Sequence, residues 1–307
     1  MRTIVLHCGT DVGSGADAGD VAGSAGGGAG EVHVELPVLP GRRDLAFLTE
    51  IAAEVLPHDT APTPEEISQQ KDVPHLQQPK RAPQQPSEPV RLIVLGPDAS
   101  LAAVVTHLMR RNLLWFEVAH VPGAYPSPAA TNWGMEALTL EQARRGAVSP
   151  VPLIRDDTGR AIVGYALLTE PDITGTSSAD GFVGEVYVDE HELFSGRSAG
   201  VQVRPTTGAP GLVAAELPFP DGSGERAGAR TTGGAGSSHA PSLWSRIKNR
   251  LGNSQTPLQR EPHAPIEGRA VQAGGPGFRY VRDGIETKKP REKVTIYRHL
   301  LDLQLVR

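Results

Sequence analysis

The sequence is poor in cysteine and has no long apolar run. Cys8 is the only cysteine among 307 residues, so an internal disulfide is excluded and a reducing compartment is indicated. No stretch approaches the roughly 18 consecutive apolar residues that a membrane-spanning helix needs. The N-terminal apolar run, which ends at Cys8, is too short for a signal peptide. These absences predict a cytoplasmic protein.

The chain also lacks a strong excess of either charge. Its formal net charge is −5, with 21% charged and 38% hydrophobic residues. This composition is typical of a soluble globular protein and gives no sign of a nucleic-acid partner. A chain of 307 residues is long enough for two domains, each with its own hydrophobic core.

Candidate metal and thiol chemistry is limited. The ten histidines show no spacing that is typical of a metal site. Asp156 and Asp157 precede Thr158-Gly159, a pattern more typical of a hairpin turn than of a metal site. Cys8 closes a short apolar strand, which favours an inert buried thiol over a reactive one.

Glycine and proline are abundant but clustered. The 35 glycines and 27 prolines mark particular segments rather than the whole chain. Residues 9–30 form a glycine-rich loop. Residues 58–89, rich in proline and glutamine, and residues 221–265 have no sustained apolar period. We therefore expect both of these stretches to be disordered insertions.

Residues 1–150 alternate between strand-like and helix-like patterns. An apolar strand at Leu92–Leu95 precedes a helical pattern with Leu101, Val104 and Leu108 on one face. Such alternation predicts an α/β domain with a parallel sheet that is covered on both faces. The expected strands are Met1–Cys8, Val32–Leu36, Leu92–Leu95 and Leu114–His120, and the expected helices are 42–56, Leu101–Arg111 and 135–146.

After about Pro150 the pattern changes to strands that are separated by turns, with little helix. This predicts a second domain, an antiparallel β-sandwich over residues 151–307. The clearest expected strands are 161–169, 181–190, 199–205 and 211–219, and residues 269–307 return to strands after the second insertion.

A short turn, Gly96-Pro97-Asp98-Ala99-Ser100, joins the strand Leu92–Leu95 to the helix that follows. Ligands of parallel sheets bind beyond the carboxyl ends of the strands. The first turn of a helix also presents free backbone N–H groups to an anion. The turn is therefore a candidate phosphate site, and the alternative is that Asp98 or Ser100 simply caps the helix.

The order of these segments and three short motifs resemble the superfamily of diacylglycerol kinases and NAD kinases. Gly96, Asp98 and Ser100 match the first glycine, the aspartate and the hydroxyl of the family turn Gly-Gly-Asp-Gly-Thr. Asn132 matches the asparagine of Gly-Thr-Gly-Asn-Asp, and Asp283 lies in Val-Arg-Asp-Gly-Ile-Glu, which resembles the late Asp-Gly-Glu motif. The lipid-kinase branch fits better, because no Asn-Glu pair of the NAD kinase kind is present.

Several departures from the family pattern remove groups that phosphoryl transfer uses. Pro97 has no N–H, and Ala99 replaces a glycine, so the turn has fewer donors and less conformational freedom. Trp133 stands in place of an aspartate. Ile285 replaces the family's glutamate, and Glu286 follows one residue later, where a strand points to the opposite face unless a bulge re-aims it.

The resemblance implies a lipid kinase that uses ATP and Mg²⁺. Such an enzyme would transfer the γ-phosphate of ATP to the hydroxyl of a lipid or of another small substrate. Its catalytic residues would be Asp98, Asp283 and Glu286, and its nucleotide-binding residues would be Gly96, Ser100 and Asn132.

The alternative is a non-catalytic nucleotide- or lipid-binding protein that has kept the fold. The replacement of the family's glutamate by Ile285 favours this alternative, whereas the presence of Asp98 favours the enzyme.

Residues 242–253 place leucine, tryptophan and isoleucine beside arginine and lysine. A segment of this kind suits peripheral contact with an anionic membrane surface, and docking on the chain's own domain is the alternative.

Overall fold

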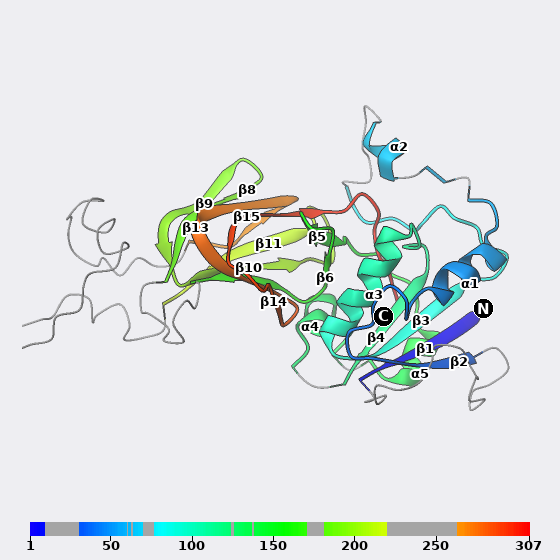
Figure 1. Ribbon diagram of the computed structural model, residues 1–307. Helices are drawn as coiled ribbons and strands as arrows, with labels where there is room; N and C mark the ends of the chain where they lie inside the picture. The colour runs from blue at the N-terminus through cyan, green and yellow to red at the C-terminus, as the bar shows by residue number, and fades with distance from the viewer. Residues whose placement is uncertain are drawn as a thin grey trace, which may run out of the picture.

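A computed structural model describes residues 1–9, 31–59, 61–62, 64–69, 77–123, 126–136, 138–170, 181–219 and 263–307. The described chain forms an α/β lobe, which contains both termini, and a β lobe beside it (Figure 1). Most of the two glycine-rich stretches 9–30 and 221–265 lies outside the described residues, and so does the candidate membrane segment 242–253.

The first lobe is built on five parallel strands in the order β16-β4-β3-β1-β2. The central strands are mostly apolar, because both faces of this sheet are covered. The strands are β1 (Arg2–Cys8), β2 (Glu31–Leu36), β3 (Val90–Gly96), β4 (Glu117–Pro122) and β16 (Gln304–Leu305).

Helices cover both faces of this sheet, as the alternating pattern predicts. α1 (Phe47–Val55) and α3 (Asp98–Arg110) pack on one face through buried stripes of leucine, valine and alanine. α5 (Leu140–Arg145) covers the other face, where Ala143 packs against apolar side chains of β1, β3 and β4. Two further short helices are α2 (Pro64–Ser68) and α4 (Pro128–Trp133).

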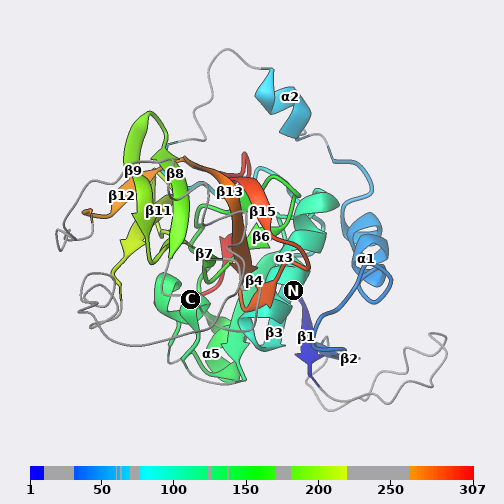
Figure 2. The ribbon, with the colours of Figure 1, turned by 60° about the vertical axis from the view of Figure 1, so that its left-hand side comes forward.

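The second lobe is antiparallel. Its longest strand, β13 (Ala270–Arg282), pairs with β15 and β8 near its start and with β7 near its end, and its pairing with β15 shifts between Gly274 and Phe278. Figure 2 shows β13 and β15 side by side, with α3 next to β6. The other strands are β5 (Ile154–Asp156), β6 (Ala161–Ile162), β7 (Ala166–Thr169), β8 (Phe182–Val188), β9 (His191–Ser198), β10 (Gly200–Pro205), β11 (Leu212–Leu217), β12 (Ile266–Gly268), β14 (Ile285–Glu286) and β15 (Arg291–Arg298).

The predicted fold class, a parallel α/β domain followed by an antiparallel β domain, is therefore confirmed. The end of the chain departs from the expected division at residue 150. β16 leaves the second lobe and pairs in parallel with β4, and Val148 and Val151 bridge to Val306 and Leu303. The last residues thus complete the first sheet.

The stretch 58–89, which the sequence predicts to be a disordered insertion, is described in part. In its described part, residues 77–89 follow a defined path along the end of the chain. The backbone N–H of Lys80 donates to Asp302 at 2.9 Å, and Arg298 donates to the carbonyl of Gln77 at 2.8 Å. These polar contacts hold an apolar-poor segment that has no sequence period of its own.

Candidate functional site

Gly96 ends β3 at a point where two backbone segments come very close. Its φ is +152°, and a Cβ at this position would lie 2.7 Å from the carbonyl oxygen of Cys8. The carbonyl of Gly96 accepts a hydrogen bond from the backbone of Gly123 at 3.2 Å. The glycine is therefore needed for the approach of β1 and for this backbone conformation.

Asp98 begins α3 but does not cap it. The residue before it, Pro97, holds the N-cap position, and no side chain caps this helix. The Asp98 carboxylate instead accepts the Ser127 hydroxyl at 2.5 Å and the backbone N–H of Ala129 at 2.8 Å. The predicted capping alternative is therefore wrong for α3, and Asp98 stabilises the start of α4, a helix that the sequence pattern missed.

Ser100 and Cys8 are buried beneath the turn. The Ser100 hydroxyl is fully buried and donates to the carbonyl of Val38 at 2.6 Å. Cys8 is buried as well, and burial raises the pKa of its thiol to about 11. A thiol with such a pKa is not ionised at neutral pH, which agrees with the expectation of an inert Cys8.

Asn132 lies on α4 and connects the two lobes. Its side-chain amide donates to the carbonyl of Gly164 at 2.6 Å and to that of Val163 at 3.3 Å. Both carbonyls belong to the turn between β6 and β7. The sequence pattern over residues 161–169 predicts one continuous strand, but the structure breaks it here.

Asp283 is the reason for that break. Its buried carboxylate accepts the backbone N–H groups of Gly164 at 2.7 Å, Tyr165 at 3.0 Å and Val163 at 3.2 Å. Three residues of the turn therefore give their N–H groups to one side chain rather than to a neighbouring strand. Burial raises the pKa of Asp283 to about 7, against the effect of these hydrogen bonds, and the nearby charge of Asp98 raises it further.

The carboxylates of Asp98 and Asp283 approach each other across Gly164. A Cβ added to Gly164 would lie 3.0 Å from an oxygen of Asp98 and 3.1 Å from an oxygen of Asp283. The structure thus brings together Asp98, Asn132 and Asp283, three of the residues that the resemblance implies. They meet at the junction of the two lobes.

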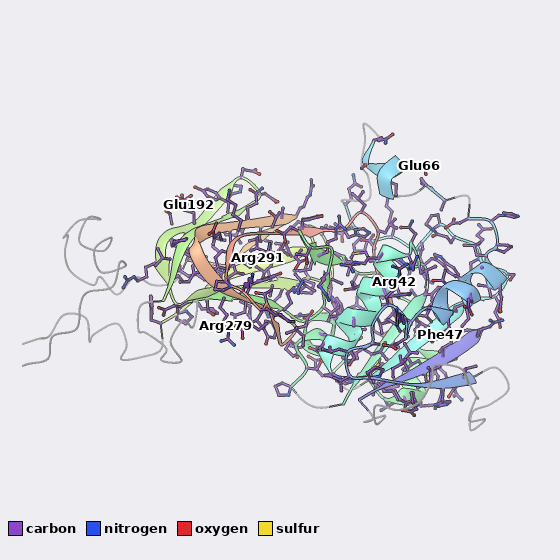
Figure 3. All side chains as sticks on the ribbon, viewed as in Figure 1. Arg42, Phe47, Glu66, Glu192, Arg279 and Arg291 are labelled. Carbon is purple, nitrogen blue, oxygen red and sulfur yellow. The ribbon has the colours of Figure 1, made fainter. Side chains whose placement is uncertain are left out.

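Glu286 is placed elsewhere. It lies on β14, is 48% exposed, and forms an ion pair of 2.8 Å with Arg279. Figure 3 shows Arg279, the partner of Glu286, on the β lobe. Ile285, before it, is also exposed. Within the part of the chain that the structure describes, the carboxylate of Glu286 accepts a hydrogen bond from Arg279 and forms none with the residues around Asp98 or Asp283.

The two clustered carboxylates do not fit a Mg²⁺ site. Mg²⁺ requires a near-octahedral set of ionised or neutral oxygen ligands that are free to turn toward it. The oxygens of Asp98 and Asp283 already accept hydrogen bonds, and the raised pKa of Asp283 leaves much of it protonated at neutral pH. Within the described ranges, no group of three histidine, cysteine, aspartate or glutamate side chains is placed to hold a metal.

Three features of the site were not predicted from the sequence pattern. The turn at Val163–Tyr165 supplies the donors to Asp283, and α4 receives Asp98. His120 lies fully buried on β4, with its Nε2 2.9 Å from the carbonyl oxygen of Gly96. A short apolar helix start after Ser127-Pro128 was the one available clue, because proline is common in the first turn of a helix.

A Gly-x-Ser-x-Gly sequence also occurs, at Gly196–Gly200. A nucleophile elbow needs an exposed serine at a strand-to-helix turn. Here Ser198 is fully buried at the end of β9, just before β10, and its hydroxyl donates to the carbonyl of Gly200 at 3.0 Å. This serine is a structural residue.

The described chain contains no helix that is long and apolar enough to cross a membrane. No protein-family model matches the sequence, and no curated protein sequence is similar to it.

Solved structures do resemble the chain. A candidate diacylglycerol kinase from Bacillus anthracis str. Sterne superposes with a TM-score of 0.51 and 10% identity, over 99% of this chain and 96% of the other. Another diacylglycerol kinase structure from the same organism gives a TM-score of 0.49 at 11% identity, over 99% and 96%. An NAD kinase from Archaeoglobus fulgidus in complex with ATP gives 0.41 at 10% identity, over 100% and 94%.

At 10% identity the likeness to the first of these structures concerns the fold. It covers both lobes, in agreement with the order of segments from which the resemblance was inferred. The chain has the two-domain fold of diacylglycerol kinase-like proteins.

Proposed function

We propose that this protein binds a nucleotide or a phospholipid on a kinase fold without transferring phosphate. The observation that carries this proposal is the position of Glu286. Its exposed carboxylate pairs with Arg279 at 2.8 Å rather than with a residue of the Asp98–Asp283 cluster, which supports the absence of a base there that would take a proton from a substrate hydroxyl.

The surroundings of Asp98 and Asp283 support the same conclusion. Asp98 holds the start of α4, and Asp283 holds the turn at residues 163–165. Carboxylates that accept these hydrogen bonds have structural roles: Asp98 joins α3 to α4, and Asp283 joins the end of β13 to the turn between β6 and β7. Phosphoryl transfer depends on groups that are positioned on the substrate and on the neutralisation of its charge, and these two side chains supply neither.

The second candidate function is an active lipid kinase that uses ATP. One observation favours it, because Asp98, Asn132 and Asp283 do converge at the junction of the lobes, where ligands of such sheets bind. An active enzyme would need these groups to exchange their present partners for substrate.

A transfer assay separates the two candidates. The protein is incubated with Mg²⁺ and ATP that carries a labelled γ-phosphate, together with a panel of lipids, and the binding of ATP and of phospholipid vesicles is measured in parallel. We expect binding without transfer. Labelled lipid that is lost in an Asp98→Ala variant would overturn the proposal in favour of the kinase. The absence of any nucleotide or lipid binding would overturn both.

A further inference from the structure

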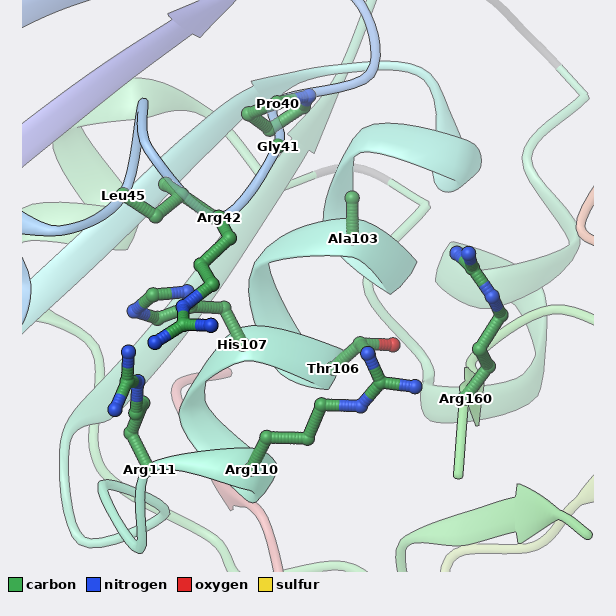
Figure 4. Close-up of a pocket in the computed structure, with 10 residues that line it drawn as sticks. All are labelled: Pro40, Gly41, Arg42, Leu45, Ala103, Thr106, His107, Arg110, Arg111 and Arg160. Atoms are coloured by element: carbon green, nitrogen blue, oxygen red, sulfur yellow. The ribbon is translucent and has the colours of Figure 1, made fainter. Parts of the chain in front are cut away.

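A cavity of about 430 Å³ lies along the outer side of α3 and does not include the Gly96–Ser100 turn. Its charged wall consists of four arginines (Figure 4). Arg42 comes from the segment between β2 and α1, Arg110 and Arg111 come from the end of α3, and Arg160 comes from the turn between β5 and β6. We call this cavity the arginine pocket. A volume of this size is in the range of small-molecule sites.

The positive charge of the arginine pocket is not balanced by acids. None of its ten lining residues is an aspartate or a glutamate, although the chain as a whole has a net charge of −5. Among the described residues, no carboxylate forms an ion pair with the side chain of Arg42, Arg111 or Arg160. Several other arginines of the chain are paired in this way, for example Arg91 with Glu117 at 2.6 Å.

The cations crowd one another and an unpartnered histidine. Burial lowers the pKa of Arg160, the charges of Arg282 and Arg110 lower it further, and the charge of Asp156, which does not line the pocket, opposes them. Burial also lowers the pKa of His107, followed by the charges of Arg111 and Arg42. His107 is 6% exposed, and within the described chain its Nε2 has no hydrogen-bond partner.

The end of a helix explains only part of this cluster. Cations near a helix C-terminus interact favourably with its dipole, and Arg110 also donates to the carbonyls of Gly159 and Thr158, each at 3.0 Å. Arg110 and Arg111 therefore have a structural reason for their positions. Arg42 and Arg160 belong to other elements and receive no such benefit.

We infer that the arginine pocket binds a terminal phosphate group, a phosphomonoester or the end of a polyphosphate chain. The planar guanidinium group suits the geometry of phosphate oxygens, with two parallel N–H donors. A dianionic phosphate would neutralise guanidinium groups that now repel one another, and it would give the buried Nε2 of His107 a partner. This inference rests on the proposed function and assigns the phosphate to this pocket rather than to the Asp98 turn.

The residues next to the arginine pocket are relevant to whether the bound phosphate belongs to a lipid or to a soluble molecule. Val38 and Leu39 are 46% and 48% exposed, and they directly precede Pro40, Gly41 and Arg42. An apolar tip next to a cluster of cations suits the surface of a phospholipid bilayer. The phosphate can therefore belong to a lipid headgroup or to a soluble molecule such as ATP, and the two sources need separate measurements.

The test uses the full chain, a double variant and a matched control. Arg42→Gln with Arg111→Gln removes two exposed guanidinium groups of the pocket. Arg43→Gln, on the same loop as Arg42, removes a charge that is also exposed but does not line the pocket. Inorganic phosphate and ATP are titrated by calorimetry, and vesicles of phosphatidylcholine with phosphatidate are tested by sedimentation. Vesicles with phosphatidylserine at equal charge control for attraction without a phosphomonoester.

We expect the double variant to bind phosphate, ATP and phosphatidate vesicles at least tenfold more weakly than wild type. Arg43→Gln should change these affinities less than twofold. Leu39→Ser identifies the source, since it should weaken vesicle binding and leave phosphate and ATP unchanged if the ligand is a lipid. Equal binding by wild type and double variant overturns the arginine pocket and leaves the proposed function standing. Phosphate transfer by wild type, with the tenfold loss still present in the double variant, overturns the proposed function and leaves the pocket.

Discussion

The two ends of α3 meet the rest of the molecule in opposite ways. At the N-terminal end, the polar side chains of Asp98 and Ser100 are matched by donors or acceptors of the chain itself. At the C-terminal end, Arg110 and Arg111 line a cavity together with Arg42 and Arg160, and the lining residues include no acid. At the first end, the polar side chains are satisfied by hydrogen bonds within the protein, and we call the cluster of Asp98, Asn132 and Asp283 the joint. The second end keeps positive charge that an external anion can neutralise.

A segment's match to a sequence motif and its capacity to bind a ligand are therefore separate properties in this protein. The turn at Gly96–Ser100 matches a family pattern, yet its groups serve the fold. The arginine pocket matches no motif, because its residues come from three separate segments. If the comparison is correct, changes at the N-terminal end should alter stability, and changes at the C-terminal end should alter ligand binding.

The largest expected effect is a pH dependence of the unfolding free energy, which comes from Asp283. Its pKa is raised from 3.8 in the unfolded chain to about 7 in the folded protein, chiefly by burial. The folded state thus binds the proton more tightly, so this contribution to stability is present below pH 4 and is lost as the pH rises through 7. The loss is on the order of 4 kcal/mol, at about 1.4 kcal/mol per pKa unit.

Urea unfolding of wild type and Asp283→Asn at several pH values between 4 and 8 measures this effect. The asparagine does not titrate, so the difference in unfolding free energy between the two proteins should change steadily over this range. Parallel curves for the two proteins would show that Asp283 ionises normally and that the joint is more open to water than the structure indicates.

The next effect concerns the close approach at Gly96. Gly96→Ala would place a Cβ 2.7 Å from the carbonyl oxygen of Cys8, at a φ of +152°. The clash and the unfavourable backbone conformation together should lower the free energy of unfolding by about 3 kcal/mol. Gly123→Ala is the control, because its Cβ would meet nothing nearer than 3.7 Å. Equal losses in the two variants would contradict the special role of Gly96.

The regular elements of the first lobe could be predicted because their signals are local. The apolar run before Gly96 and the helical spacing of Leu101, Val104 and Leu108 each lie within a few residues, and burial follows them. The same holds for the change to an antiparallel pattern after about Pro150. Tertiary contacts do not need to be known for such assignments.

The joint could be predicted only in part, because its contacts span long stretches of the chain. The resemblance implied Asp98, Asn132 and Asp283, but not that Asp283 would break the strand at residues 163–165 from a distance of about 120 residues. β16 is two residues long and has no pattern that could assign it to the first sheet. The sequence left open whether a bulge turns Glu286 toward the site, and its ion pair with Arg279 could be found only in the structure.

A smaller effect is expected at Asp98. Asp98→Ala leaves the Ser127 hydroxyl and the Ala129 N–H without their acceptor, which should cost about 2 kcal/mol of unfolding free energy. Asp98→Asn keeps one oxygen acceptor and should cost less. Affinity for phosphate should remain within twofold of wild type in both variants. A large loss of phosphate affinity with unchanged stability would reverse the comparison and make the turn the binding site.

The smallest effect is expected at Glu286. Its ion pair with Arg279 is exposed on both sides, at 48% and 43%, and pairs of this kind contribute about 0–1 kcal/mol. Glu286→Gln should therefore change the free energy of unfolding by less than about 0.5 kcal/mol and leave phosphate binding unaltered.

The same variant is informative about catalysis, because a glutamate that takes a proton from a hydroxyl contributes about 10²–10⁴-fold to a rate. Arg279→Gln breaks the same ion pair but leaves the carboxylate in place. If wild type shows phosphate transfer that Glu286→Gln abolishes and Arg279→Gln preserves, Glu286 reaches a substrate in some state of the protein, and the N-terminal end of α3 is an active site after all. If neither variant changes any measured activity, the exposed pair is only a surface contact between β13 and β14.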